Sequence, residues 1–96
     1  MNNPAVPPDS PSLEVVILAL CAEVGPGRSI NPTDAALAYA TARGEDALAW
    51  RGHLSGVRAA AVRLAEAGRL LILRKGKPAD PNDFRGVYRL GAPRVE

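Results

Sequence analysis

Cysteine and histidine are the scarcest reactive residues of this sequence. It has one cysteine, Cys21, and one histidine, His53, and therefore no cluster of either type. A single thiol cannot form an internal disulfide, and structural zinc sites need several Cys or His ligands. With no glycine-rich phosphate loop either, the sequence has no means of assembling a nucleophile, a base and an oxyanion donor. We therefore expect no metal, no cofactor and no enzymatic activity.

Aromatic residues and long hydrophobic runs are also rare. The sequence has one Trp, two Tyr and one Phe, and its longest apolar run, residues 15–22, is eight residues long. Few aromatics weaken an RNA-binding interpretation, because RNA recognition relies on base stacking. A bilayer span needs about 20 apolar residues, and the first ten residues lack the regions of a secretory signal. These absences predict a cytoplasmic protein that does not enter membranes.

Charge is distributed unevenly along the 96 residues. Residues 1–50 contain two Lys and Arg against six Asp and Glu, a net charge of −4, whereas residues 51–96 contain ten against four, a net charge of +6. The overall value of +2 hides this contrast. Concentrated positive charge is typical of a surface that binds nucleic acid.

Length and composition predict one small domain between two tails. A chain of this size forms a single thin core, and its many alanines favour closely packed helices. Residues 1–9 contain three prolines and little that can pack, so we expect a disordered tail there. The domain is predicted to cover residues 10–91, followed by a C-terminal tail at 92–96.

Capping residues and helical periodicity predict three to four helices. The first begins with Ser10 as N-cap and Pro11 at the first helical position. The second covers 32–42, where Asn31 and Asp34 form a capping box around Pro32. A shorter segment at 46–53 and a helix at 56–67, with Ser55 as N-cap and Gly68 as the stop, complete the set.

Strand signals follow the last helix. Residues 28–30 are long enough for a short edge strand, 70–73 predict a strand, 75–85 a long turn, and 86–90 the returning strand of a hairpin. Taken with the helices, this order predicts an α+β fold, namely a winged helix-turn-helix with a C-terminal β-hairpin wing.

The basic residues between 51 and 77 form the candidate nucleic-acid site. In winged helices the helix before the hairpin usually lies in the major groove, while the wing touches the backbone or the minor groove. The planar fork of arginine can bond two acceptors of a phosphate or a guanine edge. The predicted site residues are Arg51, Ser55, Arg58, Arg63, Arg74, Lys75 and Lys77.

Several of these residues also have a purely structural interpretation. Arg63 can form a surface ion pair with Glu66, and Arg51 can pair with Asp46 or Glu45. Trp50 is expected to anchor packing between helices, and Cys21 to be an inert buried thiol. Asp80 and Asp83 at the tip of the wing would oppose phosphate binding.

The sequence contains five short motifs in order: 50–51 (WR), 57–61 (VRAAA), 64–68 (LAEAG), 74–80 (RKGKPAD) and 86–90 (GVYRL). Together they resemble the motifs of a family of small bacterial winged-helix-like proteins of unknown function, and the similarity covers about residues 12–90. The family's helix start usually ends in an arginine where this chain has Leu37. The resemblance implies the winged-helix fold and no particular activity.

Two functions from different classes fit these observations. The first is a DNA-binding winged helix, a small transcriptional regulator that uses helix 56–67 and a basic wing. The alternative is a protein–protein interaction or dimerisation module without nucleic-acid binding. Val15 and Leu18 fall outside the main apolar stripe of the first helix, which predicts a homodimer through that helix unless the hairpin strands cover both side chains.

Overall fold

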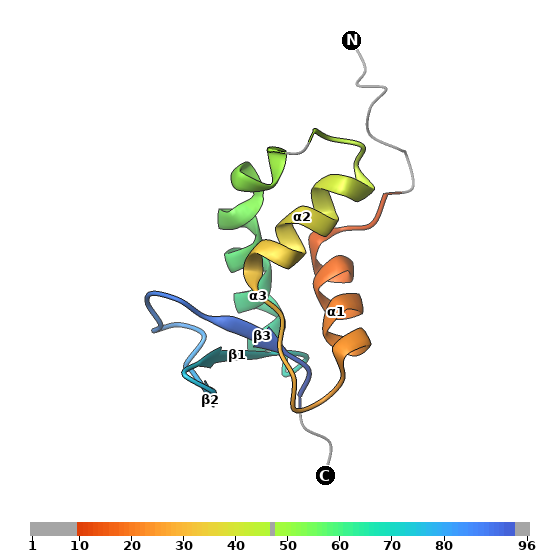
Figure 1. Ribbon diagram of the computed structural model, residues 1–96. Coiled ribbons are helices and arrows are strands. Elements are labelled where there is room, and N and C mark those ends of the chain that lie inside the picture. The colour runs from red at the N-terminus through yellow and green to blue at the C-terminus, as the bar shows by residue number, and fades with distance from the viewer. Residues whose placement is uncertain (1–9, 47, 94–96) are drawn as a thin grey trace.

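Three α-helices and a small antiparallel sheet make up the fold of the described residues (Figure 1). The computed structural model describes residues 10–46 and 48–93, so the expected tail at 1–9 and most of the one at 92–96 lie outside it. This α+β arrangement agrees with the prediction. The elements are α1 (Leu13–Val24), α2 (Pro32–Ala42), the 3-10 helix η1 (Ala49–His53), α3 (Leu54–Glu66), β1 (Leu71–Arg74), β2 (Lys77–Pro78) and β3 (Arg89–Gly91).

The first two helices begin at side-chain caps. The predicted capping box of α2 is confirmed, because Asn31 Oδ1 accepts a hydrogen bond from the Thr33 amide and Asp34 Oδ2 accepts one from the Asn31 amide, both at 3.0 Å. For α1 the predicted cap was wrong by two residues. Ser12 caps the helix through a 3.2 Å hydrogen bond from the Val15 amide to its hydroxyl oxygen.

The start of α3 also differs from the prediction. Ser55 lies inside the helix, and His53 occupies the cap position with no side-chain capping bond. The reason is local: η1 runs directly into α3, and His53 has α-region dihedrals (φ −95°, ψ −5°), so the backbone never becomes extended, as an ordinary N-cap requires. The predicted helix at 46–53 is shorter in the structure and has 3-10 geometry.

The sheet has the strand order β2-β1-β3, and all its pairings are antiparallel. The prediction of one turn from 75 to 85 was wrong, because Lys75 and Gly76 form a two-residue turn that pairs β2 with β1. Both residues have positive φ (53° and 80°), as a type I′ hairpin turn requires. The predicted strand at 28–30 is reduced to one bridge between Ile30 and Leu90.

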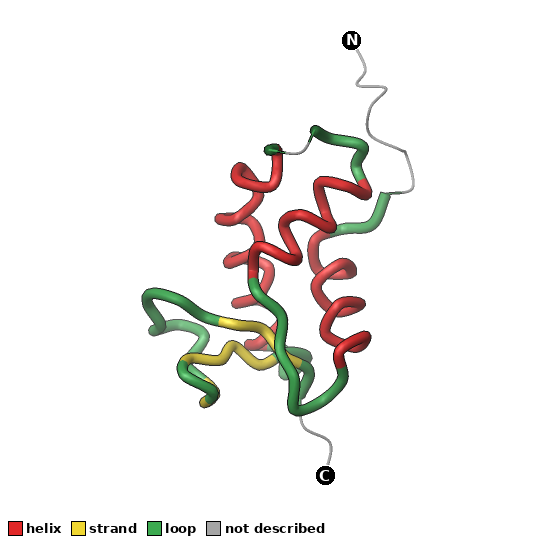
Figure 2. The backbone as a smooth tube through the Cα atoms, in the orientation of Figure 1, coloured by secondary structure: helices red, strands yellow, loops and turns green. Residues whose placement is uncertain are grey.

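The sheet packs at one end of the helices, beside the last turns of α1 and α3 and the first turn of α2 (Figure 1). The returning strand β3 begins at Arg89 and not at Gly86, so a ten-residue connection, residues 79–88, follows β2 as a loop (Figure 2). This loop and the β1–β2 hairpin form the wing, which we define as residues 71–91. In Figure 1 the loop projects away from α1.

Small side chains allow the helices to approach closely. Ala35 and Ala36 of α2 and Ala60 and Ala61 of α3 are completely buried, with larger side chains filling the space towards the sheet. Cys21 lies in the same core, and burial raises the pKa of its thiol to about 11. The thiol is therefore protonated and unreactive at neutral pH, as predicted.

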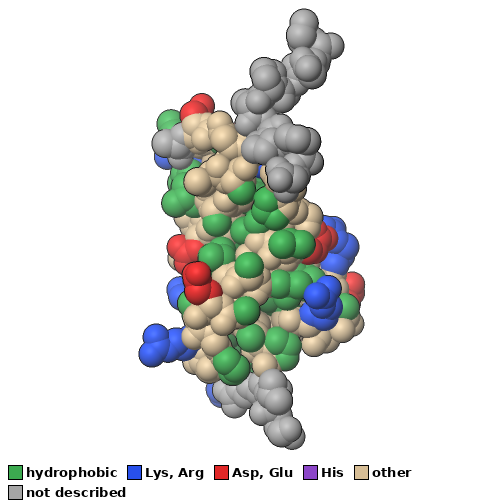
Figure 3. All heavy atoms as spheres, turned by 90° about the vertical axis from the view of Figure 1, so that its right-hand side faces the viewer, with side chains coloured by type: hydrophobic (Ala, Val, Ile, Leu, Met, Phe, Trp, Pro, Cys, Tyr) green, Lys and Arg blue, Asp and Glu red, His purple; other side chains and the backbone are tan. Residues whose placement is uncertain are grey.

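One face of α1 remains apolar and open to solvent. The side chain of Val15 is 54% exposed, so the hairpin does not cover it, whereas Leu18 is half-buried against the core. Ala19 and Ala22 are exposed one and two turns further along the same stripe as Val15. Figure 3 shows hydrophobic side chains gathered on this side of the molecule.

None of the helices in the described part of the chain has the length and apolarity that a bilayer crossing requires.

Candidate nucleic-acid interface

The two arginines of α3 point to opposite flanks of the helix. Successive helical residues are about 100° apart, so Arg58 and Arg63, five positions apart, differ by about 140° around the axis. Their contacts agree with this geometry, because Arg58 reaches the wing and Arg63 reaches α1. The two arginine contacts predicted on α3 therefore do not form one surface.

Arg58 fastens the wing to α3. Its Nη2 donates a 2.6 Å hydrogen bond to the backbone carbonyl of Phe84, and its guanidinium carbon lies 3.8 Å from the centroid of the Phe84 ring. Phe84 is buried and packs edge-on against Tyr88. A stacked guanidinium bonded to a carbonyl holds the 79–88 loop in place. The side chain is still partly exposed, so its remaining donors can reach a phosphate.

The other two helix-side arginines are also engaged by this chain. Arg63 Nε donates a 2.9 Å hydrogen bond to Oε2 of Glu14 on α1. Arg63 therefore forms an ion pair with Glu14, and not with Glu66 as the sequence predicted. Arg51 lies 5.6 Å from the ring centroid of Trp50, and Glu45 is bonded instead to Arg43 and His53. Trp50 packs against the core as predicted.

The outward face of α3 carries no cation. The residues at positions i, i+4, i+7 and i+11 from Ser55 share this face, which lies opposite the buried Val57, Ala60, Ala61 and Leu64. Ser55 and Ala59 are exposed, Val62 is half-buried, and Glu66 is exposed. This face therefore presents one hydroxyl, two small or branched apolar side chains and one carboxylate. These groups offer few hydrogen-bond donors for guanine or phosphate oxygens.

The wing carries several exposed cations. Lys75, Lys77 and Arg85 are all exposed, and none of them pairs with a carboxylate within residues 10–46 and 48–93. The acidic tip that the sequence predicted is also present: Asp80 and Asp83 are exposed, and Asp80 Oδ1 accepts a 2.9 Å hydrogen bond from the Asn82 amide. This hydrogen bond fixes the position of the Asp80 carboxylate on the loop.

Two wing cations stand outside the predicted site. Arg89 bonds Ser29 through Nε to Oγ (2.6 Å) and through Nη2 to the backbone carbonyl (2.9 Å), and Arg85 is exposed on the loop. Arg74, which was predicted, donates from Nη1 to the Val87 carbonyl at 2.6 Å. Both residues follow the acidic tip in sequence, so their positions relative to the β1–β2 hairpin depend on how the loop folds back.

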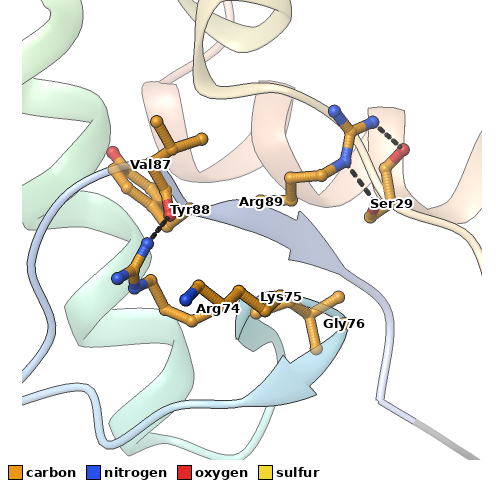
Figure 4. Close-up of a pocket in the computed structure, with 8 residues that line it drawn as sticks. Ser29, Arg74, Lys75, Gly76, Val87, Tyr88 and Arg89 are labelled. Carbon is orange, nitrogen blue, oxygen red and sulfur yellow. Dashed lines mark hydrogen bonds between the residues drawn. The ribbon is translucent and has the colours of Figure 1, made fainter.

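A cavity of about 490 Å³ is lined by three wing cations, Arg74, Lys75 and Arg89 (Figure 4). Its walls come from the β1–β2 turn on one side and from residues 87–89 on the other, with Ser29 at one end. Within the described part of the chain, no three His, Cys, Asp or Glu side chains lie close enough together to hold a metal ion.

A polar network surrounds Glu45 at the opposite end of the helices. Its Oε1 is 2.6 Å from His53 Nε2, and its Oε2 accepts a 3.1 Å hydrogen bond from Arg43 Nε. Tyr39 meets the His53 ring edge-on at a centroid distance of 4.8 Å and accepts a hydrogen bond from Arg43. These contacts tie the end of α2 to η1 and give His53 a structural role.

The network predicts a stability loss in acid. The hydrogen bonds from His53 and Arg43 lower the pKa of Glu45 below its usual value of 4.5. A carboxyl whose pKa is lower in the folded state stabilises the fold above the unfolded-state pKa, and this contribution disappears as the pH falls through the folded-state pKa. We expect Glu45→Gln to lose less stability than the wild type between pH 6 and about pH 3. Urea unfolding at the two pH values checks this, and equal losses would contradict it.

Residues 10–93 match the model of a family described as a protein of unknown function, DUF3253. The chain belongs to the DUF3253 family. This agrees with the resemblance to a small family of unknown function. No curated protein shows a significant match.

Proposed function

We propose that this DUF3253 domain is a winged helix that binds duplex DNA through its wing, as a small DNA-binding regulator. The order of α1, the Ile30 bridge, α2, α3 and the three-stranded sheet supports the winged-helix assignment. The observation that carries the proposal is the contrast between the two surfaces. Lys75, Lys77 and Arg85 are exposed on the wing, whereas the outward face of α3 has no cation.

This contrast favours contacts to phosphates over base reading. Phosphate contacts fix the position of a protein on the duplex and carry no sequence information, whereas base edges specify the sequence. Ser55, Ala59 and Val62 cannot make the bidentate contacts that distinguish guanine or adenine. We therefore propose binding with little sequence discrimination, in which α3 lies close to the groove and the wing supplies most of the affinity.

A fluorescence anisotropy titration with short generic duplexes tests the proposal. At about 50 mM salt the expected Kd is roughly 10⁻⁴ to 10⁻⁶ M, the range of non-specific binding. Three phosphate contacts give a slope of about −2.7 in log K against log salt, so affinity should fall about 40-fold between 50 and 200 mM. Two duplexes of unrelated sequence should differ by less than about threefold. Absence of binding at 50 mM salt would end the DNA proposal.

A homodimer is the second candidate, and the exposed face of α1 favours it. Val15, Ala19 and Ala22 form a stripe of small apolar side chains on which a second α1 can pack closely, and a two-fold dimer would bury it on both copies. We expect a dimeric mass by light scattering at tens of micromolar and a monomer for Val15→Glu. Val15 is exposed, so this change leaves the core intact, whereas Leu18→Glu would disturb packing. A monomeric wild type would contradict the dimer.

A further inference from the structure

We infer that the wing cavity binds a small organic anion, and specifically a monocarboxylate with an apolar body. The cavity measures about 490 Å³, within the roughly 300–1,000 Å³ range of small-molecule sites. Its apolar walls are Leu73 on β1 and Val87 and Tyr88 on the facing segment. Val87 is 81% exposed, so a ligand seated there removes apolar surface from water that the fold leaves uncovered.

The charge around the cavity selects the sign of the ligand. Arg74, Lys75 and Arg89 are among the residues that line it, and no Asp or Glu of the described ranges does. Figure 4 shows the guanidinium of Arg74 directed towards Val87 and that of Arg89 directed towards Ser29, with Lys75 on the β1–β2 turn. Three positive charges beside an apolar wall, with no carboxylate among the lining residues, attract an anion and repel a cation.

Neutral partners hold the two arginines in place. Arg74 donates to the Val87 carbonyl at 2.6 Å, and Arg89 donates to the hydroxyl and the carbonyl of Ser29. None of these acceptors carries a charge, so the bonds orient the guanidiniums without neutralising them. Each guanidinium has five N–H donors, and these bonds use one donor of Arg74 and two of Arg89. The remaining donors can bond a carboxylate, which accepts charge-assisted hydrogen bonds.

An NMR titration of the intact protein with octanoate, without nucleic acid, tests the site. The expected Kd is about 0.1–10 mM for a ligand of about ten heavy atoms, with the largest amide shifts at residues 73–76 and 87–89. Octanamide, which has the same body and no charge, should bind at least about tenfold more weakly, and inorganic phosphate should cause no comparable shifts. Equal binding by octanamide, or equal shifts with phosphate, would overturn the assignment, as would shifts centred on α1.

Two exposed positions provide variants that leave the core untouched. Lys75→Gln removes one cation, Val87→Ser removes the exposed apolar wall, and each should raise the octanoate Kd by about fivefold or more. Arg63→Gln, on the opposite flank of α3, is the control and should bind as the wild type does. Unchanged affinity in both wing variants would show that octanoate binds elsewhere. Because no DNA is present, the result does not depend on whether the wing also binds a duplex.

Discussion

Replacing Lys75 and Lys77 together by glutamine is expected to weaken binding to a generic duplex by about 100-fold at about 50 mM salt. Each phosphate contact adds about 0.9 to the magnitude of the slope of log K against log salt. At about 50 mM salt, this corresponds to about tenfold in affinity for each contact. Both side chains are exposed and neither pairs with a carboxylate in the described ranges, so the change removes charge without breaking internal contacts. Fluorescence anisotropy at fixed salt measures the effect.

The matched control removes two charges from the helix side of the molecule. The double variant Arg51→Gln/Arg63→Gln lowers the net charge by the same amount. In the wild type the Arg51 guanidinium lies 5.6 Å from the Trp50 ring centroid, and that of Arg63 is bonded to Glu14. We expect this variant to lose less than about fivefold in affinity, from the general reduction in positive charge. If the helix pair weakened binding as much as the wing pair, the wing would not be the principal contact surface.

Leu90→Ala is expected to destabilise the domain by about 2–5 kcal/mol, as large-to-small substitutions in a core do. Leu90 has no exposed surface, pairs with Ile72 across the sheet and bonds Ile30 through both backbone groups. Truncation leaves a cavity where β3, β1 and the Ile30 segment meet. A domain of this size has only about 5–15 kcal/mol of total stability, so a large fraction of it would be lost. Urea unfolding at neutral pH measures the change.

Val87→Ala is the matched control for this experiment. Val87 lies three residues before Leu90, but it is 81% exposed. Removing its methyl groups should change stability by no more than about 0.5 kcal/mol, as is usual for surface positions. A loss at Val87 comparable to that at Leu90 would mean that the Val87 side chain is packed in the core and does not face solvent.

Features that depend on neighbouring residues could be predicted from the sequence. The capping box of α2 forms within four residues, from Asn31 to Asp34, and each member has the side chain that the geometry needs. The periodicity of α3 likewise places Val57, Ala60, Ala61 and Leu64 on one buried stripe. The prediction for Ser55 was wrong because a good cap residue forms a cap only where the preceding backbone is extended, and η1 prevents that.

Features that depend on distant contacts could not be predicted. Arg58 was predicted to contact nucleic acid, but its partner Phe84 lies 26 residues away on a loop whose path depends on Gly86 and β3. The pairing of Arg63 with Glu14 spans 49 residues.

The two-residue turn at Lys75-Gly76 had a weak local signal, because lysine rarely adopts the positive φ that asparagine or aspartate usually supplies in such turns.

Mapping a DNA-bound surface by amide NMR tests most directly whether the wing is the contact surface. A generic duplex of about 15 base pairs is titrated into the ¹⁵N-labelled protein at low salt. If the wing is the contact surface, the largest shifts occur at residues 75–77 and 84–87, with smaller shifts at Ser55 and Ala59 and none along α1. Largest shifts on the outward face of α3, with the wing unaffected, would contradict it.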